Sequence, residues 1–125
     1  MKIGIDCRLF GAKHTGIGRY TQNLVENLLE IDKENNFVLF FRENLQYQAL
    51  SAKVKTVIAD IPHYSIKEQL FFSNIINKEN VDLMHFPHFN VPFFYKRNYV
   101  VTIHDLIKHV SKGKDTTTKS AYVYW

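Results

Sequence analysis

The segment Lys2–Leu28 reads KIGIDCRLFGAKHTGIGRYTQNLVENL, and it decides the fold. Its first five residues form a short apolar run that is typical of a buried strand. A loop rich in turn formers follows, and from Ile17 onward apolar side chains recur at helical spacing, with Thr15 as the expected N-cap. A strand, a loop and an amphipathic helix in this order are the opening unit of an α/β fold with a parallel sheet.

The remainder of the chain repeats this alternation of strands and helices. Further strands are predicted at Phe37–Phe41, Val54–Asp60, Val81–Phe86 and Tyr99–Asp105. A second helix is predicted over Ser65–Asn80, with an apolar side made of Ile66, Leu70, Phe71, Ile75 and Ile76. Because the strands are continuous apolar runs, we expect a Rossmann-like parallel sheet with helices on both faces, in one domain over residues 1–125. The last six residues, SAYVYW, are predicted to begin a further helix.

The composition is that of a globular protein, with 46% hydrophobic and 22% charged residues among 125. The net charge of +4 suits an anionic ligand or an acidic membrane surface, and equally a mildly basic solvated surface. No block of five like charges occurs, so no nucleic-acid partner is predicted. The single cysteine, Cys7, fits a reducing compartment. We expect a protein that is either free in the cytoplasm or peripheral at the inner face of a membrane.

Polar residues follow three of the predicted strands. They occupy the segments Asp6–Gly18, His85–Asn90 and His104–Asp105. In an open parallel sheet, ligands bind at the carboxyl ends of the strands, where the strand order reverses. We therefore expect the three segments to meet at one edge of the sheet and to form the functional site.

The glycine pair Gly16-Ile17-Gly18 is not a dinucleotide fingerprint, because the third glycine is missing and the gap after the strand is too long. No Gly-Lys-Ser/Thr sequence exists either, so neither an NAD nor an ATP site is predicted. Two interpretations stay open. The amides of Gly16 and Gly18 at a helix N-terminus bind a phosphate, with charge added by Arg19, or Gly16 permits a turn and Gly18 allows close packing.

Three segments together carry a family resemblance: residues 1–28, VDLMHFPHFNVPFF at 81–94 and VVTIHDLI at 100–107. In this order and spacing they resemble the N-terminal half of the retaining glycosyltransferases of family four. Members of that family have the GT-B fold, in which two Rossmann-like domains face each other. The resemblance covers about residues 1–107 and implies an acceptor-side domain of an enzyme that moves a hexosyl group, such as mannosyl.

The resemblance also implies a donor site. In the family, the loop after the first strand lies under the diphosphate of a nucleoside diphosphate sugar, and its glycine amides contact the phosphate. The corresponding residues here are Gly16 and Gly18. Fixed dipoles stabilise the separating charge, so neither a metal nor a further cofactor is expected.

The acceptor side is implied in the same way. The His-Asp pair after a central strand lies beside the transferred sugar and the acceptor, and corresponds to the catalytic candidates His104 and Asp105. The segment HFPHFNVP borders the acceptor cleft, which places His85, His88 and Asn90 near a saccharide or lipid-linked acceptor.

The chain departs from the family after Ile107, where KHVSKGKDTTTKSAYVYW replaces a proline-containing loop. The family's donor-binding domain, with two glutamates eight positions apart, has no counterpart before Trp125. Glu26 and Glu34 have that spacing but lie on a solvated helix face, and we regard the match as chance. We therefore expect a truncated domain (a fragment, an engineered domain or a subunit of a split enzyme) that requires a C-terminal domain or partner subunit for catalysis.

A non-catalytic binding or assembly module is the second hypothesis. Apolar surface exposed by the missing half, including the aromatic tail Tyr122, Tyr124 and Trp125, would then favour a partner or a homo-oligomer. The segment Asn90–Arg97 contains several aromatic residues and two cations. One interpretation is that it contacts an anionic membrane lipid or acceptor. The preferred interpretation is a loop with a partly buried aromatic cluster.

Other candidate chemistries are weaker. A metal site from His85, His88 and His104 is not favoured, because a His-x-x-His pair at a strand end is common by chance. Cys7 is interpreted as a small buried residue and not as a nucleophile. His104 is a candidate general base with Asp105 as its orienting partner. Adjacent residues at a strand end point in different directions, however, so Asp105 is expected to bond to nearby backbone instead. Asp6 is expected to pair with Arg8 across the loop. His14, His63 and His109 are expected to be loop or surface residues.

Overall fold

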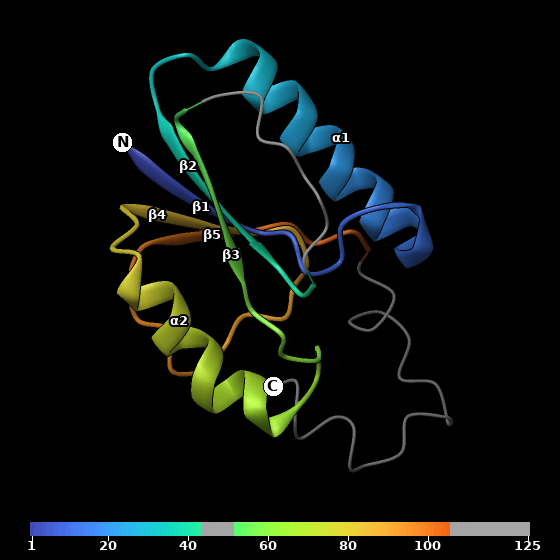
Figure 1. Cartoon of the computed structure of the whole chain (residues 1–125). Coiled ribbons are helices and arrows are strands. Elements are labelled where there is room, and N and C mark those ends of the chain that lie inside the picture. The colour runs from blue at the N-terminus through green and yellow to red at the C-terminus, as the bar shows by residue number, and fades with distance from the viewer. Residues whose placement is uncertain (44–51, 106–125) are drawn as a thin grey trace.

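The computed structural model describes residues 1–43 and 52–105, and its centre is a five-stranded sheet in which every pairing is parallel (Figure 1). The strand order is β3-β2-β1-β4-β5. The strands are β1 (Lys2–Asp6), β2 (Asn36–Phe41), β3 (Val54–Ile58), β4 (Leu83–Phe86) and β5 (Tyr99–Val101). The predicted Rossmann-like α/β fold is confirmed.

Helices cover both faces of this sheet, as the inner strand β2 illustrates. Its alternate residues enter two separate cores. Phe37 and Leu39 pack in the core that contains Val25 of α1 (Thr15–Ile31). Val38 and Phe40 pack in the opposite core, which contains side chains of the second helical segment. This double burial is the physical reason why the strand has no polar alternation.

The first helix begins where the sequence predicts, but its cap differs. Thr15 is the first residue of α1, and His14 precedes it without a side-chain capping bond. Thr15 has a φ of 55°, an unfavourable conformation for a β-branched residue. A single 3₁₀ turn, Ala12–His14, leads into the helix. The chain therefore turns sharply into α1 at Thr15, whereas an N-cap threonine would have an extended backbone conformation at this position.

The second helix presents a different face from the one predicted. Its first part is a π-helical turn, Glu68–Phe72, and its second part is α2, Ser73–Lys78. Ile66 is 80% exposed, while Glu68 is fully buried. The predicted apolar side is confirmed at Ile76, which is fully buried, and at Ile75, which packs against the same core. It is wrong at Ile66, Leu70 and Phe71, which are exposed. Glu68 and Phe72 lie in the interior instead, where the Glu68 carboxylate pairs with the buried Arg8.

The two edge strands are shorter than predicted, and β3 and β5 end at Ile58 and Val101. Residues 87–98, which connect β4 to β5, contain no helix. Within the described residues, none of the helices is both long enough and apolar enough to span a membrane. Ile107, His109 and the aromatic tail, with the helix predicted there, lie outside the described residues.

Candidate functional site

The candidate site lies at the switch point of the sheet, between β1 and β4. The order β3-β2-β1 runs to one side of this point and β4-β5 to the other. The carboxyl ends of the two strands therefore diverge into loops that leave a crevice between them. A narrow cavity opens there, and its lining includes Asp6, Ile17, Thr21, His63 and His88. Asp6 ends β1, Ile17 and Thr21 belong to α1, and the two histidines come from the segments that follow β3 and β4.

A buried charge cluster forms the floor of the site. The Arg8 guanidinium donates to both Asp6 oxygens, at 2.8 Å from Nε and 2.7 Å from Nη2, and Nη2 also lies 2.6 Å from Glu68 Oε1. Burial works to raise the pKa of the Asp6 carboxyl, but the Arg8 charge outweighs it and the pKa is lowered. The predicted Asp6–Arg8 pair is confirmed, and Glu68 is a partner that sequence reasoning missed.

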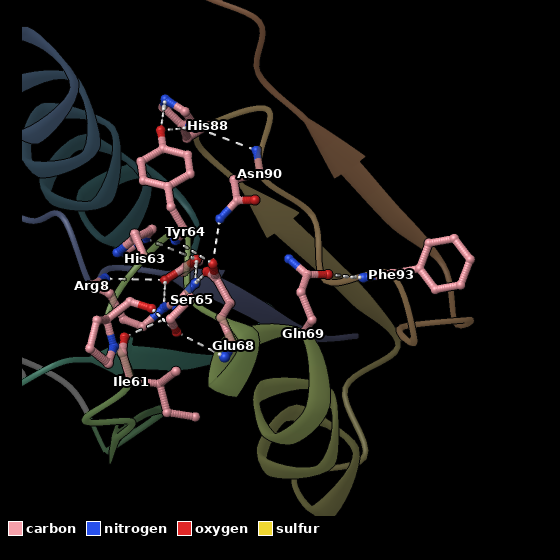
Figure 2. A network of polar contacts seen from close by, with 12 residues as sticks. Arg8, Ile61, His63, Tyr64, Ser65, Glu68, Gln69, His88, Asn90 and Phe93 are labelled. Carbon is pink, nitrogen blue, oxygen red and sulfur yellow. Dashed lines mark hydrogen bonds and ion pairs between the residues drawn. The ribbon is translucent and has the colours of Figure 1, made fainter. Parts of the chain in front are cut away.

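Glu68 connects this floor to the rim of the site (Figure 2). Its Oε2 accepts hydrogen bonds from Asn90 Nδ2 at 2.6 Å and from the Tyr64 amide at 2.8 Å. The same two residues hold His88 with other groups: Tyr64 Oη lies 2.9 Å from His88 Nε2, and the backbone amide of Asn90 donates to Nδ1 at 3.4 Å. Glu68 thus positions the His88 ring through two separate residues.

His63 lies in a loop, as one of the two predicted alternatives has it, but its side chain is largely enclosed within the site and is not on the surface. Its side chain is 10% exposed, and Nε2 lies 3.8 Å from Asp6 Oδ2. Burial lowers the pKa of His63 to about 4, and this effect outweighs the attraction of the Asp6 carboxylate. At neutral pH the ring is therefore uncharged. His63 lies just ahead of Tyr64, whose positive φ of 59° turns the chain into the helical segment.

His104 reaches the same rim from β5. Its Nε2 lies 2.7 Å from the Pro87 carbonyl oxygen, which can only accept, so this nitrogen carries the proton. In this tautomer Nδ1 is the acceptor. The ring meets Tyr20 of α1 edge to face at 4.9 Å, and its centroid lies 6.4 Å from that of His88. The predicted meeting of the three polar segments is confirmed. Asp105 is exposed beside His104.

His85 has a different partner, Thr102, which links it to Tyr20 on the α1 side of the sheet. His85 Nε2 lies 2.9 Å from Thr102 Oγ1, which in turn lies 3.2 Å from Tyr20 Oη. Burial lowers the pKa of His85. His85 and His88 therefore bind different partners, and residues 1–43 and 52–105 contain no group of three or more side chains arranged to hold a metal ion.

The two glycines of the loop have different environments. Gly18 is buried, and a Cβ there would lie 2.1 Å from the Gly11 carbonyl oxygen and 2.7 Å from that of Leu9. The Gly18 carbonyl also accepts a hydrogen bond from the Gly11 amide at 3.2 Å. This supports the close-packing interpretation for Gly18, although its partner is the preceding loop and not the sheet.

Gly16 is exposed, and a Cβ there would meet nothing within 4 Å. Helix geometry leaves the N–H groups of the first turn without an intrahelical acceptor. Those of His14 and Thr15 bond to the Gly11 and Ala12 carbonyls, whereas Gly16 and Ile17 follow in the open part of the turn. Arg19, also exposed, belongs to the same turn. The first-turn amides that are candidates for binding an anion are therefore those of Gly16 and Ile17.

The contrast between the glycines predicts opposite effects of the same substitution. Gly18→Ala should lower the free energy of unfolding by about 1–3 kcal/mol, because the methyl group overlaps backbone oxygens. Gly16→Ala should leave it unchanged or raise it by up to about 1 kcal/mol through helix propensity. Urea denaturation of the two variants measures the difference. Equal stability of Gly18→Ala and the wild type would contradict the close packing.

Cys7 is buried beside Asp6. Burial, with a smaller contribution from the Asp6 carboxylate, raises the pKa of its thiol well above the ordinary value. Because the thiolate is the nucleophile, Cys7 is unsuited to nucleophilic catalysis. The interpretation as a small buried residue is confirmed.

A second, larger cavity of about 540 Å³ lies on the β2–β3 side of Arg8. Its cations are already paired: Lys13 contacts Glu43, and Arg42 Nε lies 3.6 Å from Asp60 Oδ1. The switch point, where the start of α1 lies beside the imidazole rings, is therefore the better candidate site for an anionic ligand.

Comparisons of the chain with protein-family models, curated proteins and solved structures found no match. What the site can do follows from its residues and their geometry. It combines a helix N-terminus that favours an anion with imidazole nitrogens that hydrogen-bond hydroxyl groups. Residues that the sequence did not reveal are Tyr20, Tyr64, Glu68 and Thr102. The only signal for Glu68 was its position near the start of an apolar helix that contains just one other acidic residue, Glu79.

Proposed function

We propose that this chain is the acceptor-side domain of a glycosyltransferase of GT-B type. It would move a hexosyl group from a nucleoside diphosphate sugar to a saccharide or lipid-linked acceptor, together with a donor-binding domain or subunit. The observation that carries the proposal is the convergence of His104, His88 and the start of α1 at the switch point. The resemblance of the same segments to the family-four enzymes supports it.

The chemistry of sugar transfer matches the groups at this edge. As the nucleotide leaves, negative charge grows on the diphosphate. The amides of Gly16 and Ile17 and the positive end of the helix dipole stabilise that charge, with Arg19 as a nearby cation. They are fixed before the reaction, so no reorganisation accompanies bond cleavage. This arrangement supplies electrostatic stabilisation from the chain itself.

The imidazole rings of His104 and His88 would contact the transferred sugar and the acceptor. His104 donates from Nε2 to the Pro87 carbonyl, which orients the ring and leaves Nδ1 to accept a hydrogen bond from a sugar or acceptor hydroxyl. His88, held by Tyr64 and Asn90, lies close enough to contact the same ligand. Glu68 acts through these residues as a positioning residue.

A transfer assay tests this proposal. The chain is supplied with a donor-binding domain, in one polypeptide or as separate subunits, and nucleotide release is followed with a panel of UDP- and GDP-sugars. His104→Ala should lower turnover by about a hundredfold or more, because a preorganised hydrogen bond in the transition state is lost. His14→Ala, on the side of the second cavity, is the matched control and should retain activity. Transfer that is insensitive to His104→Ala would contradict the assignment.

A further inference from the structure

An exposed apolar surface lies away from the candidate site, on the outer side of the second helical segment. We call it the aromatic face. It consists of Ile66, Leu70, Phe71, Phe93 and Phe94, all of which are exposed. Phe93 is 71% and Phe94 53% exposed. Side chains of this size are normally buried, so a group of them on the surface indicates an interaction site.

A tight turn presents the two phenylalanines. The Tyr95 amide donates to the Pro92 carbonyl at 2.9 Å, which makes Phe93 and Phe94 the central residues of a β-turn. Pro92 and Tyr95 on either side are buried, and the Tyr95 ring packs against Phe86 at 5.7 Å. The turn is therefore anchored in the core while its tip projects outward.

The turn and the helical segment belong to one surface. The Phe93 amide donates to Gln69 Oε1 at 2.7 Å, which joins the turn to the helix side that carries Ile66 and Leu70 (Figure 2). The sequence favoured a partly buried aromatic cluster for Asn90–Arg97. The structure corrects this for Phe93 and Phe94, because the core space beneath the turn is filled by Tyr95.

The exposed charges on the two segments that carry the aromatic face have one sign. Segments 61–78 and 87–98 contain one acidic residue among the 12 of the chain, Glu68, and it is fully buried against Arg8. The cations of these segments are all exposed: Lys67, Lys78, Lys96 and Arg97. Lys96 Nζ lies 4.7 Å from the centroid of the Phe93 ring. A partner of this surface must therefore be apolar and negatively charged.

We propose that the aromatic face binds the surface of an anionic phospholipid bilayer. Phenylalanines at a turn tip insert among the headgroups, while lysine and arginine reach the phosphates and keep their apolar stems in contact with the interface. The cations contribute through the negative surface potential, and the apolar side chains through their burial. The proposal does not depend on the transfer activity.

Vesicle co-sedimentation of the full chain tests it, with phosphatidylcholine alone and with phosphatidylcholine mixed with phosphatidylglycerol. We expect binding to the mixed vesicles and a partition onto neutral vesicles at least about tenfold weaker. Phe93→Ser/Phe94→Ser and Lys96→Glu/Arg97→Glu should each lower binding to the mixed vesicles by about tenfold or more. Ile31→Ser and Lys33→Glu, exposed at the far end of α1, are the matched controls and should bind as the wild type does.

The substituted positions are exposed, so circular dichroism should show an unchanged fold for each variant. The proposal is overturned by equal binding to neutral and anionic vesicles, or by wild-type binding of the phenylalanine variant. The proposal is also overturned if the chain binds no vesicles. The chain could in that case form a dimer that the phenylalanine substitutions disrupt. That last result would assign the face to a second copy of the chain.

Discussion

Arg8→Met should lower the free energy of unfolding by about 3–5 kcal/mol, because the substitution leaves two buried carboxylates without their cation. Asp6 and Glu68 each accept hydrogen bonds from the guanidinium, and Glu68 is fully buried. The guanidinium also stacks on Phe72, with its carbon 3.6 Å from the ring centroid. A domain of this size has a total stability of about 5–15 kcal/mol, so the variant should be close to unfolding.

Urea denaturation measures this loss, and two further variants make it specific. Arg42→Met is the matched control, since Arg42 is half-exposed and pairs with Asp60 at 3.6 Å; it should cost less than about 1 kcal/mol. Adding Asp6→Asn and Glu68→Gln to Arg8→Met removes the repulsion and should restore part of the stability. A single Arg8→Met variant as stable as the Arg42→Met control would show that the buried carboxylates need no cation.

The protein should also lose stability as the pH falls from about 6.5 toward 4. The pKa of His63 is about 4 in the folded chain and 6.5 in the unfolded chain. Between these values the unfolded chain binds the extra proton, so acid favours unfolding. At about 1.4 kcal/mol per pKa unit, the full effect is about 3 kcal/mol. Below pH 3.8, protonation of Asp6, whose pKa is lowered, removes further stability.

The substitution His63→Gln should flatten most of this dependence when unfolding is measured at neutral pH and near pH 4.5. His85 keeps a smaller part of it, because burial lowers its pKa in the same direction. His14→Gln serves as the control and should retain most of the slope, since His14 lies in the less enclosed loop before α1. If the wild-type stability is constant between pH 6.5 and 4, His63 is charged in the folded state as a partner of Asp6.

The sheet could be predicted from the sequence because the burial of a strand or a helix face determines the order of apolar and polar residues along the chain. Phe37–Phe41 has no polar residue, since both of its faces are covered, and the periodicity from Ile17 marks the face of α1 that packs on the sheet. The switch point follows from the strand order, and that order was not readable. The polar ends of β1, β4 and β5 were nevertheless sufficient to predict which segments meet.

The interior of the site could not be predicted, because its pairings join residues far apart in the chain. From the sequence, Glu68 is expected on the solvent-exposed side of a helix. It faces the interior because it lies in the π-helical turn and pairs with Arg8, sixty positions earlier in the chain. His63 and Tyr64 read as loop residues for the same reason. In the glycine loop, residue type alone could not separate a residue packed against carbonyls, Gly18, from one with open space, Gly16.

The central claim is that the start of α1 at the switch point binds a diphosphate. The most direct test is an amide NMR titration of the full chain with UDP and with GDP, using uridine and guanosine as controls. We predict that the largest shifts occur at the amides of Gly16 and Ile17, with a smaller response of the His104 ring, and that the nucleosides produce none of them. If millimolar nucleoside diphosphate leaves the Gly16 and Ile17 amides unchanged, the diphosphate site is contradicted, and the close packing of Gly18 against the preceding loop is the role that remains for the glycine pair.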